Sequence, residues 1–344
     1  MLVLAREFCG LTQAELAERA ELSQGFVSLA EHAQKEPARE SVDKLGVALS
    51  FPSSFFYQAE NYTGFGLTLV FHRKRSSARV ADLRQLQAEV CLRRIHMTRL
   101  LRCMDVTSSN EFTTMDLDEH SGDPELIAAF VRAHWRLPLG PIPNLIRVVE
   151  DAGGIVFRFS FGTLDVQAMS QWPVDSPPLF FVNADTPNDM ARYSLAHEIG
   201  HVVMHRVPTE NCETEANQFA SELLMPAKAI ACQIDNMSLK LAARLKPYWR
   251  VSMQSLIRRA KDLGRIPPDH YIRLCKQISA QGMRKNEPSP IAPEEPTLAG
   301  RIIAEFQRQN RHTQKQVAAI LDISEDLFVR LYTPSDQKLR LVTG

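Results

Sequence analysis

The chain has 344 residues, 44% of them hydrophobic, and a formal net charge of zero. This length and composition predict two or three domains with true hydrophobic cores, and zero net charge means that any nucleic-acid binding must be local. No apolar run approaches the ~20 residues of a membrane-spanning helix. Arg6 and Glu7 interrupt any signal-peptide pattern, and the six cysteines are scattered without Cys-x-x-Cys pairing, so we expect a cytoplasmic protein without membrane contact.

Residues 1–60 have the pattern of short capped helices. Thr12 begins one helix with Glu15 at the capping-box position, and Ser23 begins the next. Residues 1–57 resemble the helix-turn-helix of Xre/Cro-type repressors. The resemblance implies that the second helix enters the major groove of DNA. The side chains that it assigns to DNA are Gln24 and Ser28 for bases, with Ser23 beside them, and Gln13 for phosphate.

The charge of this segment opposes DNA binding. Residues 1–57 carry five basic and eight acidic residues, a net charge of −3, whereas DNA affinity comes largely from phosphate neutralisation. A helical module for protein contacts is therefore a second interpretation.

Residues 61–120 predict a basic helical connector. The run 72–102 has nine basic and two acidic residues, a net charge of +7, on an amphipathic pattern. Phosphate contacts beside the first module and a solvated connecting helix are equally supported interpretations of this run.

Residues 121–284 predict a domain that combines helices with a small sheet. Residues 123–150 have helical patterns, and strands are predicted at 155–159, 164–168 and 179–182, separated by Gly and Pro turn signals.

The run His197-Glu198-Ile199-Gly200-His201 carries the chemistry of the chain. Two histidines four residues apart share one face of a helix, so their ring nitrogens can bind the same Zn²⁺. Glu198 then points to the open side of the metal, where it can take a proton from a bound water whose pKa the zinc lowers. A buried helix with hydrogen-bonded histidines is the structural alternative.

A third ligand is expected from the next helix, residues 213–226. Glu213 and Asn217 are four residues apart, which suits a carboxylate ligand and an amide that orients a histidine ring. Glu213 can also be read as an N-terminal helix charge. Glu215 points about 200° away and is expected to be a solvated charge. His205 and Cys212 are auxiliary candidates near the metal.

Together, His197-Glu198-x-x-His201 and Glu213-x-Glu215-Ala216-Asn217-x-Phe219-Ala220, followed by Leu223-Leu224-Met225-Pro226, resemble the ImmA/IrrE family of zinc metallopeptidases. The resemblance implies Glu213 as third ligand, a zincin-like core and helix-turn-helix repressor proteins as substrates. In such a core the edge strand holds an extended peptide, and residues 163–170 are the candidate. The predicted fold is α+β and mostly helical, with an N-terminal helix-turn-helix bundle and a helical C-terminal region.

Residues 285–297 predict a Pro-rich linker. Residues 298–344 predict a helical module whose segment 313–328 loosely repeats the Thr12–Phe26 pattern. It can bind DNA, a protein or a second copy of the chain, so a homodimer stays open.

Two functional hypotheses follow. The first is a zinc-dependent peptidase that cleaves a helix-turn-helix repressor and so switches on a stress, mobile-element or defence response. The second is a DNA-binding transcription regulator whose peptidase-like domain is a sensor with little or no catalysis. The intact set His197, Glu198, His201 and Glu213 favours the first.

Overall fold

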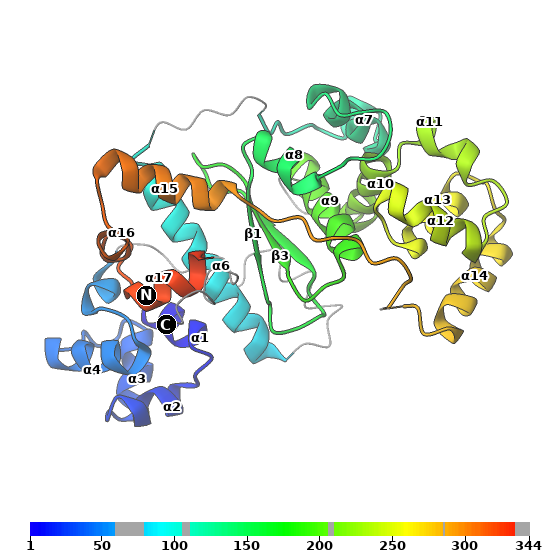
Figure 1. The fold of residues 1–344 in the computed structure, drawn as a ribbon. Coiled ribbons are helices and arrows are strands. Elements are labelled where there is room, and N and C mark those ends of the chain that lie inside the picture. The colour runs from blue at the N-terminus through cyan, green and yellow to red at the C-terminus, as the bar shows by residue number, and fades with distance from the viewer. Residues whose placement is uncertain (59–78, 105–110, 206–209, 285, 334–344) are drawn as a thin grey trace, which may run out of the picture. The chain divides into compact units, whose positions relative to one another are not determined.

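The computed structural model describes residues 1–58, 79–104, 111–205, 210–284 and 286–333. Helices dominate and the described strands form one three-stranded sheet (Figure 1), which confirms the predicted, mostly helical α+β class. Within the described ranges, no helix combines the length and apolarity needed to cross a bilayer. The chain divides into two compact units, one of residues 1–106 with 297–344 and one of residues 107–296.

The first unit joins helices from both ends of the chain. The long α6 contacts both α1 and α15. The elements are α1 (Leu2–Phe8), α2 (Gln13–Arg19), α3 (Gln24–Glu31), α4 (Arg39–Leu49), the 3-10 turn η1 (Ser53–Tyr57), α6 (Val80–Leu101), α15 (Leu298–Asn310), α16 (Gln314–Ile320) and α17 (Glu325–Tyr332).

The capping signals near the two ends produce the same local structure. Thr12 forms a capping box with Glu15, and Thr313 forms one with Gln316. In each case a residue with a left-handed backbone conformation follows, and then a serine that caps the next helix. The spacing between these residues is the same in the two segments. Every equivalent pair is 301 positions apart: Thr12 and Thr313, Glu21 and Asp322, Ser23 and Ser324. The loose sequence repeat is therefore a repeat of helix, turn and helix.

Two arginines of the basic run are bound within the first unit. Residues 72–78 of the run lie outside the described ranges. Arg93 is buried and donates to the Leu331 carbonyl oxygen (2.7 Å) and to Glu89 (2.7 Å). Arg99 donates to the Ile320 carbonyl oxygen (2.9 Å). These two guanidinium groups therefore have partners inside the unit, whereas the side chains of Arg79 and Arg84 are exposed.

A buried histidine also joins α6 to α17. The His96 ring is fully buried, and its Nδ1 lies 2.7 Å from the Tyr332 hydroxyl. Burial, and then the charges of Arg99 and Arg93, lower the pKa of His96 to about 3. In the unfolded chain the pKa of His96 is about 6.5. Between that pH and about 3, the unfolded state therefore binds a proton on this ring and the folded state does not.

We therefore predict that the first unit loses stability as pH falls from 6.5 towards 3, by about 2 kcal/mol at pH 5. Hydrogen exchange of the α6 and α17 amides at pH 7 and pH 5, corrected for intrinsic rates, measures this loss. His96→Gln should remove the pH dependence, whereas His32→Gln, at an exposed histidine of the same unit, should keep it. Equal pH dependence in all three proteins would assign it to another group.

The sheet of the second unit has the order β1-β3-β2, with β1 parallel and β2 antiparallel to β3. The predicted strands at 155–159 and 179–182 form as β1 (Ile155–Phe159) and β3 (Leu179–Asn183). The strand predicted at 164–168 is wrong: β2 is Ala168–Gln171. The preceding backbone turns instead, because the Asn183 amide binds the carbonyl oxygens of Thr163 (2.6 Å) and Val166 (2.9 Å).

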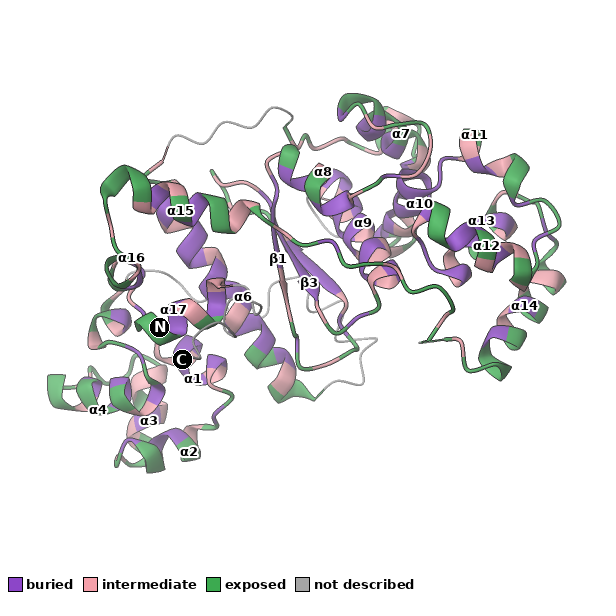
Figure 2. Ribbon diagram, in the orientation of Figure 1, coloured by how far each residue is buried: buried purple, intermediate pink, exposed green. Residues whose placement is uncertain are grey.

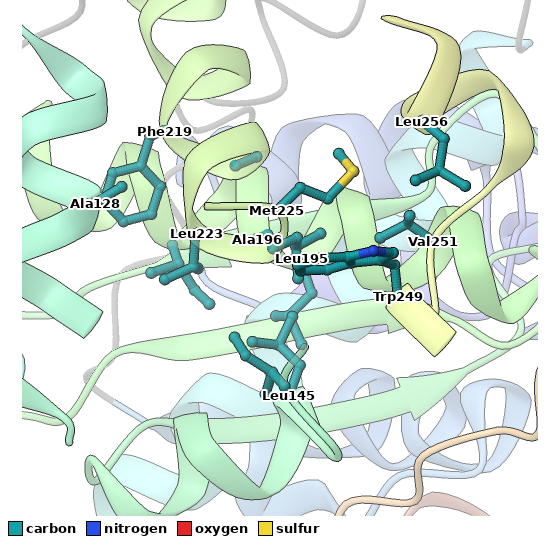
Figure 3. Close-up of a cluster of buried hydrophobic side chains, with 14 of the residues drawn as sticks. Ala128, Leu145, Leu195, Ala196, Phe219, Leu223, Met225, Trp249, Val251 and Leu256 are labelled. Carbon is teal, nitrogen blue, oxygen red and sulfur yellow. The ribbon is translucent and has the colours of Figure 1, made fainter. Parts of the chain in front are cut away.

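Helices of the same unit pack against this sheet, and α8 contacts β1. α9 contacts β2 and β3, and α10 contacts both α9 and α7. Figure 3 shows Leu195 of α9, Phe219 and Leu223 of α10 and Trp249 of α12 in one cluster, and all four are buried. Figure 2 shows buried residues along β1, β3, α9 and α10. The elements are the 3-10 turn η2 (Asp118–His120), α7 (Pro124–His134), α8 (Leu145–Asp151), α9 (Asn188–Met204), α10 (Cys212–Leu224), α11 (Ala227–Ile230), the 3-10 turn η3 (Ala231–Gln233), α12 (Leu239–Trp249), α13 (Met253–Asp262) and α14 (Pro268–Ala280).

The segment expected to be a free linker is bound to the second unit over residues 286–296. Glu294 accepts hydrogen bonds from the first amides of α8, Leu145 (2.7 Å) and Ile146 (3.1 Å), and from Arg192. Glu287 accepts from Lys246 (2.9 Å) and from the Met253 amide at the start of α13 (2.7 Å). The proline-rich composition disfavours a helix but not attachment, because carboxylates in an extended segment can cap helix N-termini.

Candidate metal centre

Gly200 controls how closely α10 approaches α9. A Cβ at this position would lie 3.3 Å from the Ala216 Cα and 3.1 Å from the Phe219 ring. A side chain here would require α10 to move by a few tenths of an ångström, so glycine favours the close contact of the two helix backbones. Glu213, one turn before Ala216 on α10, is thereby brought opposite the histidine face of α9.

Three side chains converge at this contact. The Nε2 atoms of His197 and His201 lie 3.0 Å apart. The Glu213 carboxylate lies 3.7 Å from His197 Nε2 and 3.4 Å from His201 Nε2. Among the described residues this is the set whose donor atoms all lie within 4.8 Å of one another.

The spacing suits a zinc ion. A tetrahedral site with ligand distances of about 2.0–2.1 Å has edges of about 3.3 Å, which the three donor separations bracket. Two imidazole nitrogens and one carboxylate are also a ligand set found in catalytic zinc sites, where the fourth position stays open. The residues present therefore fit the ion that the sequence motif implies.

The local charge also suits a cation. Burial lowers the pKa of His201, but its hydrogen bond with Glu213 and the charges of Glu198, Glu213 and Glu215 outweigh burial and raise the pKa above its ordinary value. The carboxylates thus concentrate negative potential on this ring.

Glu198 lies on the same helix and is buried. Its Oε2 accepts a hydrogen bond from the Ser170 hydroxyl (2.7 Å), and Ser170 is itself a buried residue of β2. A second bond, from Ser194 to the Gln167 side chain (2.7 Å), also joins α9 to the chain leading into β2. Sequence reasoning missed Ser170, because nothing in a four-residue strand marks one serine as a partner of Glu198.

The other candidates near the metal lie as follows. Asn217 does not orient a histidine: its amide donates to the Glu213 carbonyl oxygen (2.6 Å) and holds the backbone of α10 there. Cys212 is a buried residue at the start of α10, outside the donor set. His205 contacts His201 and Glu215. Glu215 is not the solvated charge that was expected, because its carboxylate lies 2.8 Å from His205 Nε2.

The residues assigned to DNA lie in the first unit. Gln24 is exposed at the start of α3, and Ser28 is half-buried one turn later. Ser23 caps α3 by accepting from the Phe26 amide (3.2 Å). Gln13 donates to the Glu31 carboxylate (2.7 Å), so its amide has a partner within the unit.

The His-Glu-x-x-His pattern on a helix is one way in which metallopeptidases bind zinc. Comparison with protein families agrees with this class: residues 149–261 match the model of the IrrE N-terminal-like domain, Peptidase_M78. The match includes the sheet, α9 and α10, and therefore every residue of the candidate metal centre. Comparison with curated proteins gives no match.

We predict that Glu213→Gln sharply lowers the zinc content of the full chain, because an amide is a much poorer ligand than a carboxylate. Elemental analysis after dialysis against a weak chelator measures the bound zinc. Glu210→Gln, at an exposed glutamate just before α10, removes the same charge and should keep the wild-type content. Equal zinc in the two variants would remove Glu213 from the ligand set.

Proposed function

We propose that the second unit is a zinc-dependent peptidase in which His197, His201 and Glu213 hold the metal and Glu198 is the general base. The observation that carries this proposal is the convergence of three donors within 4.8 Å of one another. Two of them are on α9, the helix that also presents Glu198, and the third is on α10. The match to a peptidase family over residues 149–261 supports it independently.

Bound zinc supplies Lewis-acid polarisation and lowers the pKa of water. Glu198 accepts the proton of the attacking water and delivers it to the departing amine, as a general base and then a general acid. The hydrogen bond from Ser170 to one carboxylate oxygen of Glu198 holds the rotamer of this side chain. Burial in the protein preserves this geometry, since few water molecules compete for the carboxylate.

The substrate is an extended peptide segment. β2 lies at an edge of the sheet in the order β1-β3-β2 and contacts α9 through Ser170 and Glu198. An edge strand presents unpaired backbone groups that can bind an extended chain by strand addition. A peptide added to β2 would lie beside Glu198, which is the role that we predicted for residues 163–170.

We further propose that the cleaved protein is a helix-turn-helix repressor and that cleavage switches on a stress, mobile-element or defence response in the cytoplasm. This proposal rests on the resemblance to the ImmA/IrrE family. Intact-mass analysis of a panel of purified Xre-type repressors, each incubated with the zinc-loaded chain, tests it. Cleavage of none of them would leave the peptidase-like unit as a sensor.

Glu198→Gln should keep the zinc content and the fold, because the residue is not a ligand, and should lower repressor cleavage by at least about 100-fold, the usual contribution of general-base catalysis. Cleavage is followed by intact mass and zinc by elemental analysis. Glu150→Gln, at a glutamate of α8 outside the centre, serves as the control. Undiminished cleavage by the Glu198 variant would exclude this role.

The first unit is proposed to bind DNA through α3. Gln24 is exposed where a recognition helix begins, which supports base contact by its amide. The net charge of −3 in residues 1–57 limits non-specific affinity, so the proposed contact is weak and sequence-dependent. The C-terminal repeat has Glu325 at the position equivalent to Gln24, and a carboxylate there opposes phosphate.

Gln24→Ala is expected to relax sequence preference at one or two base pairs, by roughly 1–3 kcal/mol of discrimination. Selection from a random-sequence DNA pool at low salt, followed by sequencing, measures the preference. Gln34→Ala, at an exposed glutamine beyond α3, should leave it unchanged. If the wild-type chain enriches no sequence at all, α3 is instead a surface for protein recognition.

A further inference from the structure

The candidate metal centre continues outward along a chain of three side chains. His201 Nδ1, on the opposite side of the ring from the Nε2 that faces His197 and Glu213, lies 3.0 Å from His205 Nδ1. His205 Nε2 then lies 2.8 Å from Glu215 Oε2. The His205 side chain is only 4% exposed and that of Glu215 is 21% exposed.

The contacts determine where the hydrogens must be. A histidine that binds metal through Nε2 carries its hydrogen on Nδ1, so His201 donates to His205 Nδ1. That nitrogen can accept only if the His205 hydrogen is on Nε2, and from there it donates to the Glu215 carboxylate. Each donor in this series of side chains therefore has an acceptor, and all the hydrogen bonds form with both histidine rings neutral.

The same two helices supply these three side chains and the proposed ligands. His201 and His205 are one turn apart at the end of α9, and Glu213 and Glu215 are two residues apart at the start of α10. Residues two apart on a helix point in different directions. Glu213 can thus face the donor nitrogens while Glu215 faces His205, so a single helix contact positions both carboxylates.

We propose that His205 and Glu215 are positioning residues for the metal: they fix the tautomer and ring orientation of His201 without binding the ion themselves. This inference rests on the proposed metal centre. Outer hydrogen-bond partners of ligating histidines characteristically change metal affinity by 10–100-fold when they are removed.

The test measures metal affinity in the full chain, by competition between the protein and a chromophoric chelator for Zn²⁺ and for Co²⁺. His205→Leu and Glu215→Leu should each weaken Zn²⁺ affinity by about 10–100-fold. His205→Gln should recover most of that loss, because its amide can accept from His201 and donate to Glu215. The visible absorption bands of the Co²⁺ form should keep their wild-type positions in all variants at saturating metal, because the ligands are unchanged.

Matched controls are His270→Leu, at a half-buried histidine bound to the Met237 carbonyl oxygen, and Glu210→Leu, at an exposed glutamate. Both should bind zinc as the wild type does. Wild-type Zn²⁺ affinity in both His205→Leu and Glu215→Leu would overturn the positioning role of these residues and leave the proposed metal centre intact. A shift of the Co²⁺ bands in His205→Leu would show that His205 is itself a ligand, which would also overturn its positioning role. Failure of the wild-type protein to bind zinc would refute the proposed function and, with it, the positioning role of His205 and Glu215.

Discussion

The contact between α9 and α10 at Gly200 is the constraint on which the candidate centre depends. Without a side chain at this position, the backbone of α10 can pass Ala216 and Phe219 directly over α9. Glu213 and Glu215 then reach His201 and His205, while the apolar side of the same helix, with Phe219 and Leu223, fills the core. Packing and site geometry are thus set by one helix pair, so a change that separates the helices damages both.

Buried ionic contacts hold the other end of α9. Arg192 binds Glu294, and Asp189 binds Lys246 (2.5 Å), which also binds Glu287. Both glutamates belong to the extended segment 286–296. Glu287 accepts from the first amide of α13, and Glu294 accepts from the first amide of α8. Removing Lys246 would leave the buried carboxylates of Asp189 and Glu287 without this cation, which is strongly unfavourable. The N-terminal half of α9 is therefore fixed by charge, and its C-terminal half presents the histidines and Glu198.

The first unit uses positive charge internally. Arg93 and Arg99 of α6 donate to carbonyl oxygens near the ends of the C-terminal helices, a role that consumes two of the arginines counted in the basic run. Counting charges along the sequence overestimates the number of arginines that can contact phosphate. A guanidinium has five N–H donors and can bind the free carbonyl oxygens at a helix end equally well. The C-terminal repeat thus completes a helical unit with residues near the N-terminus.

Local information was sufficient for much of this protein. The capping residues Thr12, Ser23, Thr313 and Ser324 begin their helices as their sequences predict, because a cap involves only neighbouring residues. The spacing of His197 and His201 placed both histidines on one helical face for the same reason. Long-range contacts decided the rest: Ser170 beside Glu198, Glu215 beside His205, and the carboxylates of 286–296 against α8 and α13. The partners in these pairs come from different elements, and only the packing of those elements brings them within hydrogen-bond distance.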